Sequence, residues 1–315
     1  CSEQHNMTFA GTGKFLGKTI DVPFKAYIER YLYGAPVGAL DVYWKLTRMA
    51  VDFPHREVPV DPYLLGLWIG DGTYGESSLT NCELEILAYC RAIAPRYGAE
   101  LAVLELPDRN TRKITFKTNE GRRFLGETIA HNDLRRFFRG QCSRDGAKVI
   151  PDDYLYTDEA TRLALLAGIV DTDGFLTSGG IELTTVSPVL RDQYLHLARS
   201  AGLAAYTSEK VATIKSIGFS GIYQRVMISG DVARIPCLVA RRQAAERQQI
   251  KRVTVTGFSV DPIGDGDYCG FTLSGDGRFL LGDFTVTHDA SPVEFRLPEA
   301  IPRPNRKSRA KKTPE

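Results

Sequence analysis

Two short segments of nearly the same pattern, about a hundred residues apart, constrain most strongly what this 315-residue chain can fold into. Residues 64–72 read LLGLWIGDG, and residues 166–174 read LAGIVDTDG. Each is an apolar run with small residues four positions apart. Such residues lie on one side of a helix and let a second helix approach closely. If the two helices pack on each other, Asp71 and Asp173 at their ends come together.

Asp71 and Asp173 are therefore a predicted metal site. Two converging carboxylates suit a hard divalent cation such as Mg²⁺, and a cation bound in this way can assist cleavage of a phosphodiester. Asp171 is a third carboxylate in the second segment, but its counterpart in the first segment is Ile69. The symmetry of the pair thus argues against a shared metal role for Asp171. The alternative is that both segments are helices ended by ordinary Asp-Gly turns.

The order of the predicted elements divides the chain. The pattern predicts a helix at 64–69, a helix at 81–97, strands at 101–105 and 113–117, and a helix at 122–138. A similar order follows, with a helix at 161–170, a strand at 181–186, a helix at 188–201, strands at 203–208 and 223–229, and a helix at 231–245. We therefore expect an α+β fold in which residues 59–250 form two pseudo-symmetric αββαββα repeats, at about 59–150 and 151–250.

The two ends of the chain differ from this central part. Residues 1–58 are mixed, with a strand expected at 19–24 and a helix at 24–32. Residues 251–291 are rich in Thr, Val, Phe, Tyr and Gly with turn signals between them, which predicts an all-β segment. Residues 292–315 are rich in Pro, Arg and Lys and poor in apolar residues, so we expect a basic disordered tail.

Composition limits the class of protein. Apolar residues make up 43% and charged residues 25% of the chain, as in ordinary globular proteins. The basic residues gather in clusters, which suits a polyanionic partner, although any one cluster also fits a solvated helix face. There is no Cys-x-x-Cys spacing, no signal-peptide pattern and no long apolar run. We therefore expect an intracellular protein without a membrane partner, nuclear in a eukaryotic host.

The paired segments resemble the motifs of the LAGLIDADG (dodecapeptide, DOD-type) homing endonucleases. The resemblance is closest to the intein-encoded group of the yeast vacuolar-ATPase intein and the mating-type-switching endonuclease. Residues 148–151, which read KVIP, match a Lys-x-Ile-Pro segment that precedes the second motif in that group. The resemblance implies Mg²⁺-dependent cleavage of double-stranded DNA at a long target site. It also implies a monomer that forms an internal pseudo-dimer.

The resemblance assigns roles to particular residues. Asp71 and Asp173 become catalytic metal ligands, and the backbone carbonyls of Gly70 and Thr172 are further candidate ligands because hard cations accept such oxygens. Lys148 corresponds to a lysine that lies near the scissile phosphate in the family.

The second repeat departs from the family pattern. Residues 235–242 offer Arg242 in place of a second lysine. Arginine stabilises negative charge but does not act as a base, because it does not deprotonate. The carboxylates match in the two repeats while the cations differ, so we expect one DNA strand to be cut more readily than the other.

The family reads DNA with strands laid in the major groove. On the strands expected here, or beside them, seven basic side chains are candidates for contacts with phosphate or base edges. They are Arg109, Arg112, Lys113, Lys117, Lys210, Lys215 and Arg225.

The chain ends resemble the Hint splicing domain of inteins, at residues 1–5, 268–273 and 279–289. This resemblance makes His5, His288 and Asp289 splicing-like residues. It also shows departures. The terminal Asn of an intein is Asp289 here, and Ala290 offers no side-chain nucleophile. We therefore expect a shortened splicing domain that has lost its first segment and splices poorly.

Two other functions stay open. The first is a protein-splicing intein whose endonuclease is passive, against which Asp289 argues. The second is a non-catalytic LAGLIDADG descendant that binds nucleic acid. The presence of both Asp71 and Asp173 argues against that descendant, and the lack of a clear second lysine argues mildly for it.

Overall fold

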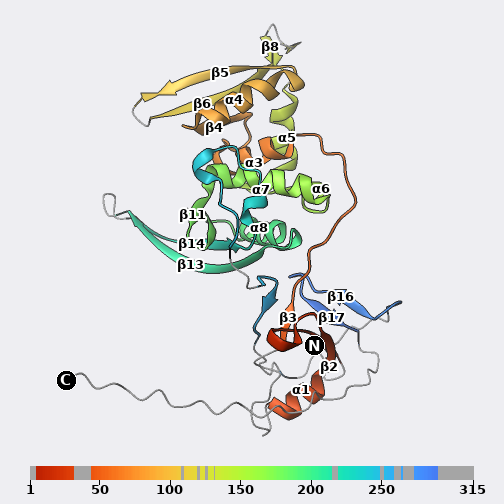
Figure 1. Cartoon of the computed structure of the whole chain (residues 1–315). Helices are drawn as coiled ribbons and strands as arrows, with labels where there is room; N and C mark the ends of the chain where they lie inside the picture. The colour runs from red at the N-terminus through yellow and green to blue at the C-terminus, as the bar shows by residue number, and fades with distance from the viewer. Residues whose placement is uncertain are drawn as a thin grey trace, which may run out of the picture. The chain divides into compact units, whose positions relative to one another are not determined.

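A computed structural model describes residues 5–31, 44–107, 110–118, 121–124, 127–130, 132–214, 219–248, 252–258, 264 and 273–289 (Figure 1). The chain forms two compact units, one of residues 1–48 with 255–315 and one of residues 49–254. The boundaries predicted from the sequence are 58/59 and 250/251. The predicted tail at 292–315 lies outside the described residues. Within the described residues, no helix has both the length and the apolar composition that a bilayer crossing needs.

Two helices form the centre of the 49–254 unit, as the paired segments predict (Figure 1). They are α3 (Pro62–Asp71) and α7 (Glu159–Asp173). Each begins at an aspartate N-cap, Asp61 or Asp158, whose carboxylate accepts a hydrogen bond from a backbone N–H of the first turn. Most of their residues are buried on all sides, which is why these helices are apolar all round rather than amphipathic.

The strands that follow α3 and α7 are arranged in the same order. After α3 come β4 (Ser78–Asn81), α4 (Leu84–Ile93), η2 (Ala94–Tyr97), β5 (Ala99–Leu106) and β6 (Thr111–Thr118), with sheet order β4-β6-β5. After α7 come β11 (Phe175–Thr177), β12 (Gly180–Thr185), α8 (Pro188–Ser200), β13 (Ala204–Ile214) and β14 (Phe219–Ser229), with sheet order β11-β12-β14-β13. An isolated bridge between Gly72 and Leu79 takes the place of β11 in the first half. The elements expected here from the sequence are confirmed, although α4 begins three residues later than the pattern predicts.

The helix predicted at 122–138 is wrong in its first part. The structure has a two-stranded ribbon of β7 (Gly121–Phe124) and β8 (Glu127–Ala130), and only then α5 (Asp133–Gln141). The side chain of Asn132 accepts a hydrogen bond from the backbone N–H of Arg135, so this residue caps the helix and fixes its start. Next along the chain are β9 (Ser143–Arg144), β10 (Ala147–Lys148) and α6 (Asp152–Leu155), which the sequence did not predict.

The helix predicted at 231–245 is also wrong. The structure has two short 3₁₀ turns, η5 (Val232–Arg234) and η6 (Ala240–Arg242), separated by irregular backbone. Pro236 explains the break, because proline lacks the N–H that a helix needs and disfavours helical geometry at the residue before it. In the described residues the second half thus lacks the last helix of the expected αββαββα order.

The unit of residues 1–48 and 255–315 brings both ends of the chain into one sheet. Its elements are β1 (Asn6–Gly11), η1 (Gly13–Phe15), β2 (Thr19–Pro23), α1 (Phe24–Tyr31), β3 (Trp44–Thr47), β15 (Val255–Thr256), β16 (Arg278–Leu280) and β17 (Val286–His288). The sheet order is β15-β3-β1-β17-β16, and β2 also pairs with β1. Phe9, Val22 and Trp44 form the core of this unit.

Candidate functional site

Helices α3 and α7 touch through their small residues. A methyl group added at Gly66 would lie 2.2 Å from the carbonyl oxygen of Leu165, and one added at Gly168 would lie 2.3 Å from that of Tyr63. At the C-terminal end, a methyl group on Gly70 would lie 2.0 Å from Oγ1 of Thr172. The close approach predicted from residues four positions apart is therefore confirmed, and it holds the two helix ends together.

Asp71 and Asp173 lie at these adjoining ends. Asp173 is exposed on one side, but the protein packed against its carboxylate removes part of the surrounding water. This desolvation, and then the negative charge of Asp71, raise the pKa of Asp173 to about 6. Burial also raises the pKa of Asp71, against the effect of a hydrogen bond from Asn81. The two carboxylates repel each other because they are close together in a partly desolvated place.

Lys148 is brought to this place by a tight hairpin. The two turn residues, Asp145 and Gly146, both have left-handed backbone (φ 50° and 79°), which is the geometry of a two-residue turn between β9 and β10. The ammonium group of Lys148 donates hydrogen bonds to the last-turn carbonyl oxygens of α3, at 2.9 Å to Trp68, 3.0 Å to Ile69 and 3.1 Å to Gly70.

These contacts place a cation at the negative end of the helix dipole, directly beside the carboxylates. Burial lowers the pKa of Lys148 to about 8, while the charges of Asp173 and Asp71 oppose that shift. The carbonyl of Gly70, a predicted metal ligand, thus accepts a hydrogen bond from Lys148 and keeps its second lone pair.

Arg242 is the second cation near the carboxylates. It lies in η6, and its charge acts on both Asp71 and Asp173. Its Nε atom is buried and has no hydrogen-bond partner among the described residues. The structure therefore brings together the four residues that the sequence predicted as catalytic.

Asn81 belongs to the site, although the sequence indicated another role for it. Its position suggests the cap of the predicted helix at 81–97, but the structure places it at the end of β4. Its Nδ2 donates to Oδ2 of Asp71 at 2.5 Å, and its Oδ1 accepts from the backbone N–H of Glu83 at 2.6 Å. Asn81 therefore orients a carboxylate that lies ten positions earlier in the chain.

The donor set at the helix ends fits a hard divalent cation. Carboxylate oxygens of Asp71 and Asp173 and the carbonyls of Gly70 and Thr172 are oxygen ligands, as Mg²⁺ prefers. Among the described residues no group of three acidic, His or Cys side chains gathers, so water or substrate oxygens would complete the coordination. A bound cation would also offset the repulsion that raises the pKa of Asp173.

The candidate DNA-contacting residues of the first sheet lie on β6. Ile114 and Phe116 are buried, so the alternation of the strand places Lys113 and Lys117 on its other face. Lys113 pairs with Glu76 at 3.2 Å, and Lys117 is exposed.

Arg112 does not share the strand face of Lys113 and Lys117. It alternates with Lys113 and therefore lies on the face of β6 that carries Ile114. It donates to Glu105 at 2.9 Å and to the carbonyl of Cys82 at 3.0 Å. Arg109 lies outside the described residues.

The candidates of the second sheet lie on β13 and β14. Lys210 pairs with Glu182 at 3.0 Å, and Arg225 lies 3.4 Å from the same carboxylate. Ile181, Val226 and Ile228 are buried, so these polar side chains lie on the face turned away from the core. Lys215 lies outside the described residues.

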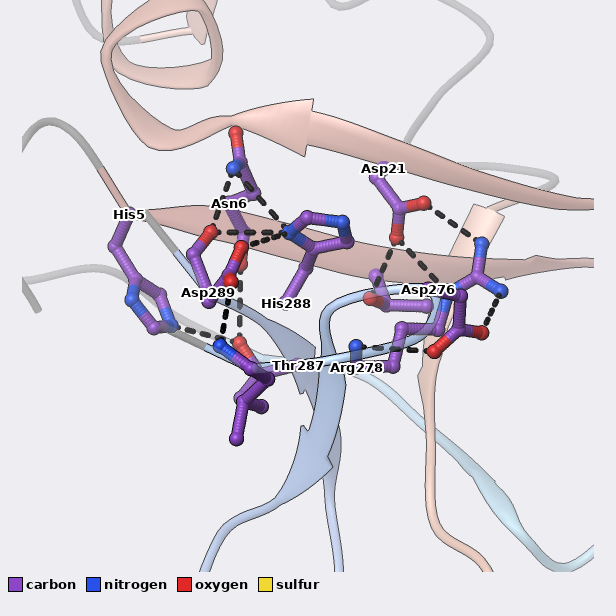
Figure 2. A network of polar contacts seen from close by, with 10 residues as sticks. His5, Asn6, Asp21, Asp276, Arg278, Thr287, His288 and Asp289 are labelled. Carbon is purple, nitrogen blue, oxygen red and sulfur yellow. Dashed lines mark hydrogen bonds and ion pairs between the residues drawn. The ribbon is translucent and has the colours of Figure 1, made fainter. Parts of the chain in front are cut away.

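The splicing-like residues gather in the other unit (Figure 2). Strands β1 and β17 pair with Asn6 opposite His288, so residues from both chain ends become neighbours. Nδ1 of His288 lies 3.0 Å from the carboxylate of Asp289, and Nδ2 of Asn6 donates to the backbone carbonyl of Asp289 at 2.7 Å. Nε2 of His5 lies 2.8 Å from Oγ1 of Thr287. Burial lowers the pKa of His5.

The chain is similar in sequence to known proteins. Residues 160–235 match the LAGLIDADG-like domain family. Over 251 residues the chain is 25% identical to the homothallic switching endonuclease of Saccharomyces cerevisiae, a match that covers 70% of this chain and 42% of that protein. Over 163 residues it is 32% identical to the replicative DNA helicase DnaB of Mycobacterium intracellulare, covering 51% of this chain and 22% of that protein. The chain thus spans less than half of the length of these relatives.

Solved structures of I-DmoI are also similar to the chain. I-DmoI in complex with DNA and Ca has a TM-score of 0.36 and 13% identity, covering 54% of this chain and 82% of that chain. I-DmoI in complex with DNA and Mn has a TM-score of 0.35 and 13% identity, covering 54% and 88%.

Residues 160–235, which begin in α7 and include the second Asp-Gly-terminated segment, therefore form a LAGLIDADG-like domain.

Proposed function

We propose that residues 49–254 form a site-specific endonuclease that cleaves double-stranded DNA at a long target site and depends on Mg²⁺. The observation that carries this proposal is the convergence of two carboxylates and two cations at the adjoining ends of α3 and α7. The yeast relative is named as an endonuclease, which supports the same chemistry.

Asp71 and Asp173 would hold the cation, which when bound supplies Lewis-acid activation of the phosphodiester and neutralises its charge. The protein's own residues set the orientation and the charge of these carboxylates before a cation binds. Asn81 fixes the orientation of the Asp71 carboxylate. Asp173, whose pKa is about 6, is mostly ionised at neutral pH and is then ready to bind a cation.

The two cations would stabilise negative charge on the phosphate. Lys148, whose pKa is about 8, is mostly protonated at neutral pH, and three carbonyls hold its ammonium group in place. Arg242 keeps its charge throughout and has an Nε–H without a partner among the described residues. A lysine can also lose or gain a proton and an arginine cannot, so the two strands of a duplex would meet different chemistry.

Two sheets with basic side chains on their strands would bind the duplex. Of the candidates that the structure describes, Lys113, Lys117, Lys210 and Arg225 lie on the strand faces turned away from the core. Phosphate contacts of this kind position DNA without reading its sequence. The shared strand order after α3 and α7 supports a monomer that acts as an internal pseudo-dimer.

A plasmid-library cleavage assay with Mg²⁺ tests the nuclease. The wild-type chain is compared with Asp71→Asn and Asp173→Asn, and we expect both variants to lose cleavage. Asp153→Asn is a matched control, because Asp153 is an exposed carboxylate on α6 that pairs only with Arg56 in the described residues. Unchanged nicking by both active-site variants would exclude the assigned site.

We also propose that the unit of residues 1–48 and 255–315 belongs to the Hint domain of a DOD-type intein, with defective splicing. The His5, His288 and Asp289 cluster supports this proposal. The side-chain amide nitrogen of an Asn can attack the backbone carbonyl of the same residue and so release the segment that follows. A carboxylate at neutral pH does so poorly. Mass spectrometry should find no fragment that begins at Ala290, and Asp289→Asn should increase its release. Release from the wild-type chain would contradict the proposed defect.

A further inference from the structure

Asp171 is a buried carboxylate two residues before Asp173, and its Oδ1 has no hydrogen-bond partner among the described residues. It is 1% exposed, and a single oxygen, Oδ2, accepts three hydrogen bonds. The donors are the hydroxyl of Tyr63 at 2.7 Å, the backbone N–H of Leu238 at 2.7 Å and that of Val239 at 3.3 Å. Tyr63 belongs to α3, so this carboxylate joins both central helices to the backbone of Leu238 and Val239.

The hydrogen bonds to Asp171 satisfy backbone N–H groups that lie outside any helix or strand. Residues 235–239 form neither helix nor strand. The N–H groups of Ile235 and Cys237 donate to backbone carbonyls in local turns, whereas those of Leu238 and Val239 donate to Asp171. A buried backbone N–H without a partner is costly, and a carboxylate is a strong acceptor for several such groups at once. Asp171 therefore holds irregular backbone at a fixed position against α7.

Arg242 is one turn away from that anchor. The N–H of Val239 donates to Asp171, and the carbonyl of Val239 accepts from the N–H of Arg242 at 2.8 Å, which closes η6. A second contact holds the neighbouring residue, because Nε of Arg241 donates to Glu83 at 2.9 Å. Both contacts fix the backbone and leave Nε of Arg242 without a partner among the described residues.

The first half of the domain delivers its cation by another route. Lys148 comes from a two-residue-turn hairpin, and the position that matches Asp171 is the buried Ile69. In the second half, Arg242 follows irregular backbone instead of a hairpin. The buried carboxylate of Asp171 takes the place of the apolar Ile69.

We propose that Asp171 is a positioning residue for Arg242: through the backbone of Leu238 and Val239 it fixes the turn that carries the guanidinium to the paired carboxylates. The inference rests on the proposed nuclease for its catalytic meaning. It does not make Asp171 a metal ligand, because this carboxylate is only 1% exposed and its counterpart in the first half is the apolar Ile69.

Solution NMR of the full chain tests the anchor without any cleavage. Asp171→Asn keeps the shape of the side chain but removes its charge. We expect the amides of Leu238 and Val239 to exchange about tenfold faster or more, while amides in the middle of α7 are unchanged. The Nε–Hε signal of Arg242, identified by its loss in Arg242→Lys, should also shift.

Asp158→Asn is the matched control, because Asp158 is a carboxylate at the opposite end of the same helix whose hydrogen-bond partners are His55, Thr157 and Thr161. It should leave all three signals unchanged. If Asp171→Asn does not fold, Tyr63→Phe removes one donor and should move the same signals in the same direction by less. Unmoved signals in the folded variants would overturn the proposal.

A double-mutant cycle on the cleavage rate separates positioning from general stability. If Asp171 acts through Arg242, Asp171→Asn should slow the wild type but change Arg242→Ala by less than about twofold. Combined with Lys148→Ala, the same substitution should multiply its effect. A multiplied effect on Arg242→Ala would show a merely structural role and overturn the proposal. If the wild type itself cleaves no DNA, the proposed nuclease fails and the NMR signals alone decide the role of Asp171.

Discussion

Gly66 and Gly168 face each other where α3 and α7 cross, so closely that a side chain on either would overlap the backbone of the other helix. An added methyl group at Gly66 lies 2.9 Å from Cα of Gly168, and the reverse distance is also 2.9 Å. This contact sets the separation of the helix ends, and with it the separation of Asp71 and Asp173.

Gly66→Ala or Gly168→Ala should destabilise the domain by at least about 1–3 kcal/mol, because the new methyl group meets backbone that cannot rotate away. Gly140→Ala is the control, since Gly140 lies in α5 with open space around it and alanine favours a helix. Urea unfolding measures both. Equal midpoints for Gly66→Ala and the wild type would show that the helices are farther apart than described.

Asn81→Ala should slow cleavage about tenfold while changing stability little, because Asp71 loses the donor that orients it. Asn81→Asp should slow it further, because a third negative charge would then lie beside Asp71. Single-turnover cleavage at saturating Mg²⁺ gives the rate. A normal rate for Asn81→Ala would mean that Asp71 does not need this hydrogen bond.

Asp173→Asn should stabilise the chain at neutral pH when no divalent cation is present. The pKa of Asp173 is raised to about 6, so the folded state binds this proton more tightly than the unfolded chain. The stability that this proton contributes is present below the usual pKa of the carboxyl and is lost as pH rises through about 6.

The gain from Asp173→Asn should therefore grow over that pH range and vanish in acid. Urea unfolding of both proteins across that range measures it, with EDTA present. Adding Mg²⁺ should stabilise the wild type more than the variant. A gain that is the same at every pH would contradict the repulsion between Asp71 and Asp173.

Gly277→Ala should destabilise the unit formed by the chain ends more than Gly275→Ala does. Both glycines have left-handed backbone, so both substitutions carry the conformational cost of alanine there. Only at Gly277 would the methyl group also meet His288, 2.8 Å from its Cε1. Thermal unfolding gives the difference, and the ring signals of His288 should shift in Gly277→Ala alone. Equal effects would mean that His288 does not pack on this turn.

Local patterns were enough to predict much of the domain. Small residues four positions apart in two apolar segments predicted the contact of α3 with α7, because side-chain size and helical period are properties of the sequence itself. The same segments predicted that Asp71 and Asp173 meet. Resemblance of short motifs to a family then pointed to Lys148 and Arg242, and to the His288 cluster.

Where the sequence failed, distant residues decided the outcome. Residues 122–138 contain good helix formers, yet a ribbon and a capped helix share that stretch. Asn81 has the signature of a cap, and only the fold places it against Asp71. The pattern of residues along the chain cannot predict such partners, because each hydrogen bond depends on which polar groups the rest of the fold brings together and leaves unpaired.

Asp171 shows this division most clearly. The sequence alone determined that a carboxylate stands where the paired segment has Ile69, and that symmetry makes it an unsuitable metal ligand. Only the tertiary structure decided its role, because its three donors come from Tyr63 on the other helix and from residues 238–239, about seventy positions later. A buried charge must find donors wherever packing provides them, and packing is a property of the whole domain.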